Sequence, residues 1–286
     1  MLAAASCVVT SFAQDPSIAV SKYLPLSARI GNALVSYIAY LGQFFYPVGL
    51  AAFYPHPESG LPIWKVTGAL LILVGVSAAA WIGRRRCSYL LVGWLWYLGM
   101  LIPVIGLVQV GDQARADRYT YLPQIGLVIA LVWGAAAAGR KFLPAGKNAD
   151  YRRWLGGSTS ALAVVILATI ACRQTSYWRD SETLWTRTLA CTARNATAQY
   201  NLGVTLAQRG DIPAAIKCFR ETLAIQPRSG DAENNLGVLL AQSGRLDEAT
   251  RHFRAAVKIR PDLLDAHNNL RMAIQQQNRF RQATSP

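Results

Sequence analysis

The chain has 286 residues, of which 52% are hydrophobic and only 15% are charged, and its formal net charge is +14. Soluble globular domains are usually about 25% charged, so this composition argues against a fully soluble protein and indicates contact with lipid. The positive charge does not indicate nucleic-acid binding, because no base-stacking or groove-reading motif accompanies it. Residues 1–172 contain five acidic side chains and residues 173–286 contain ten. We therefore expect a membrane region followed by a soluble helical region.

Cysteine and histidine form no recognisable site in the sequence. The five cysteines and three histidines are widely separated, which argues against a zinc site or a disulfide framework. No hydrolase triad and no phosphate-binding loop appears. We therefore predict no metal site and no cofactor bound by this chain, and the motifs leave the catalytic residues unknown.

The first two apolar stretches are unlike ordinary membrane spans. Residues 1–13 are too short to cross a bilayer, and no Lys or Arg precedes them as in a signal peptide; we interpret them as the remnant of a span. Residues 30–55 are uncharged but contain Asn32, Ser36, Gln43 and four tyrosines. This composition favours an interfacial or re-entrant segment on the outer face over a full crossing.

Four later segments are apolar enough to cross a bilayer, which takes roughly 20 residues. They are residues 66–82, 88–110, 121–139 and 154–172. The loops at residues 84–86 and 140–153 are basic, and basic loops stay in the cytoplasm. Alternation then places residues 111–120, and everything after residue 172, on the outer side. The region 1–172 is therefore predicted to be a polytopic transmembrane helix bundle.

The C-terminal region repeats with a period of 34 residues. Asn201-Leu202-Gly203 recurs as Asn235-Leu236-Gly237 and, with one change, as Asn269-Leu270-Arg271. This is the tetratricopeptide period, in which each unit is a pair of antiparallel helices. We expect Gly203 and Ala215 to let the two helices approach closely, and Phe219 to fill the gap towards the next repeat. The region 173–286 is predicted to be an all-α solenoid made of a partial unit 177–195, repeats 196–229 and 230–263, and a partial unit 264–286.

Three asparagines of the repeats are candidate ligands for an extended peptide. Asn201, Asn235 and Asn269 stand one repeat apart, and their amides can donate to and accept from a peptide backbone. The alternative is that asparagine is common at this position in repeats that share no ligand. Both interpretations remain open from the sequence.

The outer loop before residue 121 is a candidate site for a lipid phosphate. Arg115, Asp117, Arg118 and Tyr119 lie together at the predicted membrane surface, and a guanidinium can pair with a phosphate through two parallel hydrogen bonds. The alternative is a cluster that caps a helix and anchors it in the interface, with no ligand.

Three segments resemble a known family, the transmembrane and tetratricopeptide-repeat-containing protein O-mannosyltransferases and especially their bacterial relatives. They are residues 29–54 (RIGNALVSYIAYLGQFFYPVGLAAFY), 101–127 (LIPVIGLVQVGDQARADRYTYLPQIGL) and 177–180 (YWRD). The order of the membrane and repeat regions is also similar. The resemblance implies the C-terminal part of a membrane-embedded glycosyltransferase whose donor is a polyprenyl-phosphate-linked sugar and whose acceptor is a protein.

The resemblance also implies a location, the bacterial inner membrane with the repeats on the periplasmic or outer face. In that family the catalytic acid lies in the first outer loop after the first span. None of Asp15, Glu58, Asp112 and Asp117 matches that position, so the chain is expected to lack the catalytic acidic loop. The alternative function is a non-enzymatic membrane anchor whose repeats bind a partner protein.

Overall fold

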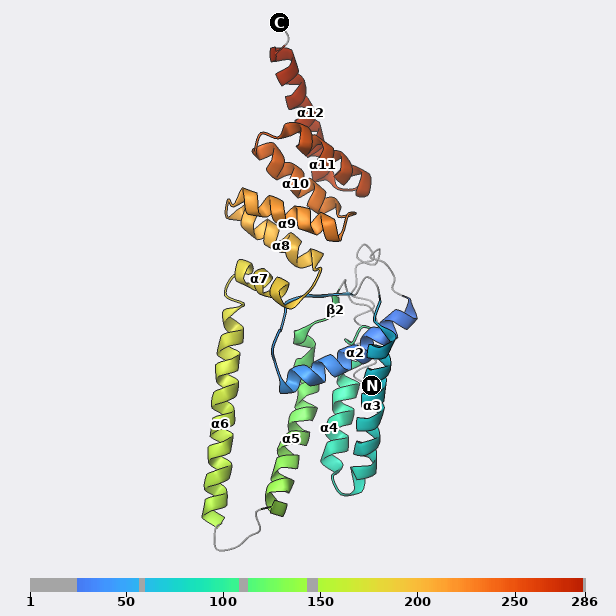
Figure 1. Cartoon of the computed structure of the whole chain (residues 1–286), viewed down its shortest axis with the longest axis vertical. Helices are drawn as coiled ribbons and strands as arrows, with labels where there is room; N and C mark the ends of the chain where they lie inside the picture. Colours follow the sequence, from blue (N-terminus) through green and yellow to red (C-terminus); the bar gives the residue numbers. More distant parts are fainter. Residues whose placement is uncertain (1–24, 57–59, 108–112, 143–148, 285–286) are drawn as a thin grey trace. The chain divides into compact units, whose positions relative to one another are not determined.

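The computed structural model describes residues 25–56, 60–107, 113–142 and 149–284, and these are almost entirely helical (Figure 1). The all-α prediction is therefore confirmed. The chain forms two compact units, residues 1–175 and 176–286. The apolar segment 1–13 lies outside the described residues.

The first unit contains the helices expected for a membrane region. Its elements are α2 (Leu26–Phe45), α3 (Ile63–Ile82), the 3-10 turn η2 (Gly83–Arg85), α4 (Ser88–Leu101), the 3-10 turn η3 (Asp117–Thr120), α5 (Tyr121–Phe142) and α6 (Ala149–Ser176), with the short antiparallel strands β1 (Tyr54–Pro55) and β2 (Gln113–Arg115). Among the described residues, three helical segments are long and apolar enough to cross a membrane: Ile63–Arg85, Asp117–Gly139 and Gly156–Ser176. These coincide with three of the four predicted spans; that they cross a bilayer stays a prediction.

The helix of the remaining predicted span, residues 88–110, is shorter than expected. α4 has 14 residues, or about 21 Å at 1.5 Å per residue, whereas the hydrocarbon core of a bilayer is about 30 Å thick. Pro103 follows directly and offers no backbone N–H to continue the helix. Gly106 then adopts a φ of 93°, which glycine tolerates best, so the chain turns.

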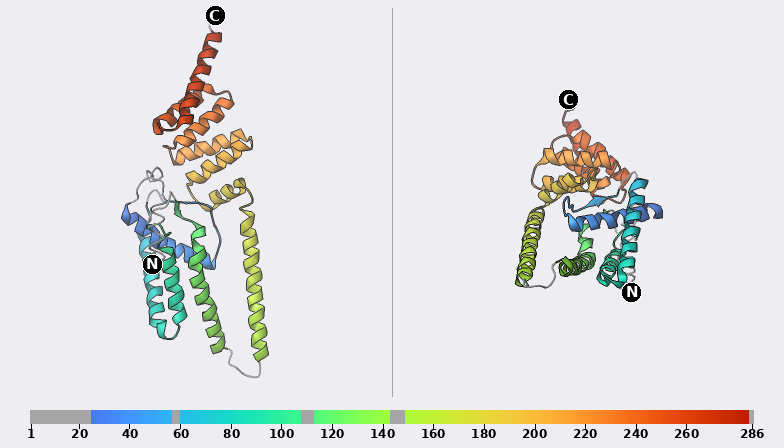
Figure 2. Two further views of the ribbon diagram at one scale, coloured as in Figure 1. Left: turned by 180° about the vertical axis from the view of Figure 1, so that it is seen from behind. Right: turned by 60° about the horizontal axis from the view of Figure 1, so that its bottom comes forward.

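Helix α2 covers this turn. In Figures 1 and 2, α2 runs across the ends of α3, α4 and α5 instead of alongside them. The Asn32 amide donates to the Ala114 carbonyl (2.9 Å), and the Tyr37 hydroxyl donates to the Leu98 carbonyl (2.8 Å). Tyr40 is buried in the same apolar cluster as Leu101 and Ile105. That residues 30–55 lie at the membrane interface stays a prediction.

Helices α4 and α5 pack with their backbones in contact. A Cβ atom on either Gly93 or Gly126 would lie 2.3 Å from the carbonyl oxygen of the other glycine. Small residues at helix crossings permit such an approach, which is a common way of packing helices in membranes.

The second unit is a row of antiparallel helix pairs. Its elements are α7 (Ser181–Cys191), α8 (Ala196–Gln208), α9 (Ile212–Ile225), α10 (Gly230–Gln242), α11 (Leu246–Ile259) and α12 (Leu264–Thr284). The turn inside each complete pair contains a glycine with positive φ, Gly210 at 85° and Gly244 at 77°. The helix pairs α8–α9 and α10–α11 lie within residues 196–229 and 230–263; that these are the bounds of the repeats stays a prediction.

The close contact within each pair is the one expected, and the large residue has one neighbour more than expected. A Cβ on Gly203 would lie 3.0 Å from the ring of Phe219, and one on Gly237 would lie 2.7 Å from the ring of Phe253. Phe219 therefore covers the glycine of its own repeat as well as packing towards the next one.

The predicted partial unit 264–286 contains no second helix among its described residues. α12 is one unbroken helix of 21 residues and passes through Asn278, which occupies the place of Gly210 and Gly244. Arg271 replaces the glycine that admits the phenylalanine ring. Both positions that build a tight pair have thus changed, which explains why α12 continues as a single helix.

We predict that Gly126→Ala destabilises the first unit by about 1–3 kcal/mol, because the added methyl overpacks the contact with α4. Gly134→Ala is the matched control on the same helix, since its Cβ would have an ordinary contact of 3.8 Å with Tyr89. Thermal unfolding of both variants of the full chain in detergent measures the difference. An equal loss in the two variants would contradict the proposed backbone contact.

Candidate functional site

The predicted phosphate segment forms a junction beneath α2, and Asp117 is its centre. Asp117 Oδ2 accepts hydrogen bonds from the Tyr54 hydroxyl (3.1 Å) and the Ala51 backbone N–H (3.2 Å), and Oδ1 accepts one from the Gln43 amide (3.2 Å). Three separate parts of the chain therefore meet at this carboxylate. Asp117 is oriented into the protein and does not face a ligand from outside.

Tyr54 links the loop after α2 to the same carboxylate. Burial raises the pKa of the Tyr54 phenol, and the nearby charge of Asp117 raises it further. The phenol therefore keeps its proton and serves as a donor. Gln43 Oε1 is buried and has no hydrogen-bond partner in the described chain, so the junction keeps one free acceptor.

The two arginines of the segment have different environments. The Arg115 guanidinium lies over the Tyr54 ring, 4.3 Å from its centre, and is half-buried. Arg118 is exposed and lies 5.2 Å from the centre of the Tyr119 ring. Tyr119 accepts a hydrogen bond from the Gln113 amide (2.7 Å). Of the four residues proposed from the sequence, Arg118 alone combines a positive charge with full access to an external anion.

Both ends of α3 carry a tryptophan beside a cation. At its N-terminus the Lys65 ammonium lies 5.4 Å from the Trp64 ring, and just after its C-terminus the Arg84 guanidinium lies 4.4 Å from the Trp81 ring. Both tryptophans are exposed. They are separated by about 25 Å along the helix at 1.5 Å per residue, close to the thickness of a hydrocarbon core.

The first helices of the repeats share a chain of side-chain hydrogen bonds. The Asn269 amide donates to Asn234 Oδ1 (2.9 Å), the Asn234 amide lies 3.4 Å from Asn235 Oδ1, and the Asn235 amide donates to the Tyr200 hydroxyl (3.0 Å). This chain joins α12, α10 and α8. Asn201 is not part of it, because its amide donates to the Thr197 carbonyl of its own helix (2.8 Å).

All three predicted ligand asparagines are therefore partly occupied inside the protein, Asn235 and Asn269 by side chains of other repeats and Asn201 by its own helix. Asn234, which connects Asn235 and Asn269, was not predicted from the sequence. Its neighbour Asn235 matched the 34-residue register and was chosen as the candidate ligand instead. The adjacent pairs Asn234-Asn235 and Asn268-Asn269 were the available signal. The two end groups of this hydrogen-bonded chain, the Tyr200 hydroxyl proton and Asn269 Oδ1, make no further hydrogen bond among the described residues, and both residues are half-buried.

An apolar row accompanies the hydrogen-bonded chain. Val204, Val238 and Met272 follow each other at the same 34-residue spacing, each three residues after Asn201, Asn235 and Asn269 respectively. Positions three or four apart share one side of a helix, so the row lies on the side of α8, α10 and α12 that carries the hydrogen-bonded chain. We call this surface the A-helix face. Met272 is exposed, and the two valines are half-buried.

The described residues contain no cluster of His, Cys, Asp or Glu that could hold a metal ion. The groups described above are hydrogen-bonding side chains, one exposed arginine at the junction and an apolar row. Such groups can bind an anion and an extended chain.

Comparison with known families identifies the repeats. The sequence model of the tetratricopeptide repeat matches residues 173–229 and 200–263. Over 105 residues the chain is 31% identical to the human protein O-mannosyl-transferase TMTC4. The aligned region covers 36% of this chain and 13% of the human protein. The mouse protein of the same name is 31% identical over 106 residues, or 37% and 13% of the two chains. The chain thus spans about an eighth of the length of these relatives.

Solved structures with similar repeats include a crystal structure of MamA, with 21% identity, a TM-score of 0.33 and coverage of 34% of this chain and 57% of that one. Another is the first tetratricopeptide domain of Spaghetti (RPAP3) bound to an HSP90 peptide. It has 17% identity, a TM-score of 0.34 and coverage of 42% and 95%.

We predict that Asn234→Ala lowers the stability of the repeats by about 1–3 kcal/mol, because it leaves two amide groups without their partners. Asn268→Ala is the matched control, since Asn268 is exposed on α12 and surface changes usually stay within about 0.5 kcal/mol. Far-ultraviolet circular dichroism during urea unfolding of the full chain reports the loss of repeat helix. Indistinguishable midpoints for the two variants would show that the hydrogen-bonded chain does not stabilise the array.

Proposed function

We propose that this chain anchors a tetratricopeptide array in a membrane and that the A-helix face binds an extended segment of a partner protein. The observation that carries the proposal is that the chain of side-chain hydrogen bonds and the apolar row run together across α8, α10 and α12. Amides and a tyrosine hydroxyl offer groups for a peptide backbone, and the row from Val204 to Met272 offers apolar contacts. The match to the tetratricopeptide model supports a protein-binding module.

The membrane location is supported by the ends of α3. Tryptophans favour the boundary between hydrocarbon and headgroups, and Lys or Arg beside them reach the aqueous side. Trp64 with Lys65 and Trp81 with Arg84 have the spacing that one crossing requires. This spacing and the basic loops together support our proposal that residues 84–86 lie in the cytoplasm. The repeats then lie on the periplasmic or outer side of a bacterial inner membrane.

A second candidate function is glycosyl transfer to protein from a polyprenyl-phosphate sugar. The partial match to the O-mannosyl-transferases supports it, as does Arg118, which is exposed beside the outer end of α5. In this function Arg118 pairs with the lipid phosphate while Asp117 holds the segment in place. The repeats then present the acceptor protein.

The first proposal can be tested with peptides selected from a random display library against the full chain in nanodiscs. Met272→Glu should weaken the selected peptides about tenfold, or ~1.4 kcal/mol, because it places a charge in the apolar row. Asn278→Glu on α12 is the control, since Asn278 is also exposed but does not stand three, four or seven residues from Asn269 or Met272. Equal binding by wild type and Met272→Glu, measured by fluorescence polarisation, would contradict a ligand on this face.

The phosphate role of Arg118 is tested by Arg118→Lys, which keeps the charge but loses the paired hydrogen bonds. We predict about tenfold weaker binding of radiolabelled polyprenyl phosphate to the full chain in detergent. Arg86→Lys, at an exposed position of the predicted cytoplasmic loop, should have no effect. If Arg118→Lys and Arg118→Ala both bind as wild type does, with an unchanged melting temperature, the residue has no role towards phosphate.

A further inference from the structure

The second helices of the two complete repeats carry a set of exposed cations. On α9 these are Lys217 and Arg220, and on α11 they are Arg251, Arg254 and Lys258. Lys217 and Arg251 are one repeat apart, and so are Arg220 and Arg254. Spacings of three, four and seven residues place them along one side of each helix. We call these five residues the basic ridge.

Within the described part of the chain, the cations of the ridge take part in no salt bridge. Among the described residues, the ion pairs involve Arg209, Arg245, His252 and Arg260, and none involves a member of the ridge. Most cations at protein surfaces have nearby acids that reduce the local potential. Here the five charges stay available to an external anion.

The acids of the same helices are largely occupied. Glu248 accepts two hydrogen bonds from Arg245 (2.7 and 2.6 Å), Asp247 accepts one from Gln277 (2.7 Å), and Asp211 caps the N-terminus of α9. Glu221 is the remaining acid of α9 and α11, the one for which no such contact is described. The potential along the ridge is therefore positive.

The ridge is continuous from one helix to the next. Hydrogen bonds from Arg245 lower the pKa of Glu248, and the positive charges of Arg251 on α11 and Arg220 on α9 lower it further. One carboxylate can be influenced by both arginines only if they lie near each other. The cations of α9 and α11 therefore act on a partner as one surface.

The character of the ridge favours a diffuse partner. Among the described residues of α9 and α11, no large hydrophobic side chain is exposed, whereas specific protein interfaces depend on buried aromatic or aliphatic anchors. Charges at regular spacing without such anchors suit a surface of mobile anions. Lipid headgroups form such a surface, and polybasic segments beside a membrane bind them.

The position of the repeats in the chain brings this surface within reach. The candidate span Gly156–Ser176 ends four residues before α7 begins at Ser181. A short tether of this kind converts binding to the bilayer into an intramolecular step with a high effective concentration. Residues 176–286 also carry 15 Lys and Arg against 10 Asp and Glu, a net charge of +5.

We propose that the basic ridge binds the headgroups of the anionic bilayer in which the chain is anchored. This rests on the proposed membrane anchoring and adds a second contact between the repeats and the membrane. The A-helix face, on the other helices of the repeats, remains available for a protein segment.

The chain contains its own reporters for this contact. Lys217 and Lys258 are the only lysines after residue 172, and both belong to the ridge. The full chain is reconstituted in nanodiscs of phosphatidylcholine alone, or of phosphatidylcholine and phosphatidylglycerol in equal amounts. A water-soluble acylating reagent is applied briefly, and mass spectrometry gives the rate at each lysine. We expect acylation of both to be about threefold slower or more in the anionic discs at low salt, and to recover at high salt.

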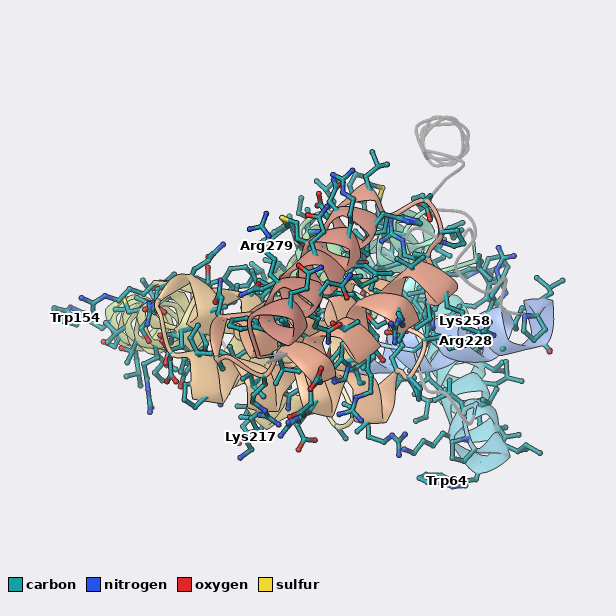
Figure 3. The ribbon with its side chains drawn as sticks, turned by 90° about the horizontal axis from the view of Figure 1, so that it is seen from above. Trp64, Trp154, Lys217, Arg228, Lys258 and Arg279 are labelled. Atoms are coloured by element: carbon teal, nitrogen blue, oxygen red, sulfur yellow. The ribbon has the colours of Figure 1, made fainter. Side chains whose placement is uncertain are left out.

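Two triple variants that keep both lysines separate the ridge from total charge. The first carries Arg220→Gln, Arg251→Gln and Arg254→Gln, and it should lose the protection. The second removes the same charge elsewhere through Arg194→Gln, Arg271→Gln and Arg279→Gln, all at exposed positions, and it should keep the protection. Figure 3 shows Arg279 and Lys217 projecting from opposite edges of the repeat unit.

Each other result overturns the proposal. Equal acylation in the two kinds of disc shows that the ridge does not meet the headgroups. Loss of protection in both triple variants assigns the effect to net charge. Protection by soluble polyglutamate, but not by phosphatidylglycerol, assigns the ridge to an acidic protein. A chain that floats free of the discs contradicts the membrane anchoring itself, a separate failure detected by co-elution before any labelling.

Discussion

The backbone between α4 and α5 has to satisfy its polar groups next to apolar helices, and much of the first unit follows from that constraint. α4 ends at Leu101, so the chain must turn where a longer helix would have paired its own backbone. An unpaired N–H or C=O facing lipid costs several kcal/mol. α2 supplies the partners: Asn32 donates to the Ala114 carbonyl, while the Tyr40 hydroxyl accepts from the Ala116 N–H and donates to the Ala116 carbonyl. The unusual polar and tyrosine content of α2 is therefore a requirement of the irregular segment that it covers.

The same constraint determines how the candidate phosphate segment can act. Because Asp117 receives three hydrogen bonds from the region of α2 and the loop after it, it fixes the backbone from which Arg118 projects. The backbone changes here from an extended strand to a 3-10 turn, so adjacent side chains point in different directions. Because Asp117 points inward, the next side chain, Arg118, points outward. Asp117 and Arg118 are thus not an ion pair among the described contacts. One residue positions the segment, and the other is available to an external anion, so the charge of Arg118 is not already neutralised by its neighbour.

The sequence predicted the elements better than the side-chain contacts. Hydropathy and length identify α3, α5 and α6, because each is a long apolar run of the kind that a membrane span requires. The repeats were also predictable, since Gly203 and Gly237 must admit a phenylalanine ring at the same place in each unit. The early end of α4 was not predicted, because the apolar run in the sequence continues past Pro103. Pro103 itself was the available signal for that end. The direction of Asp117 could not be read either, as its donor Tyr54 is 63 residues away and only the fold brings the two together.

The repeat unit separates its interactions by chemistry between its two sets of helices. On α10, two acids have basic side chains beside them: Asp231 receives two hydrogen bonds from Arg260, and Glu233 lies 2.6 Å from His252. The A-helix face itself consists of amides, a hydroxyl and apolar side chains, whose interactions depend little on ionic strength. The second helices instead present unpaired cations, whose attraction to anions falls steeply with salt because the Debye length shortens. A single array can therefore hold one partner by contacts of short range and another by charge, and neither contact requires the residues of the other.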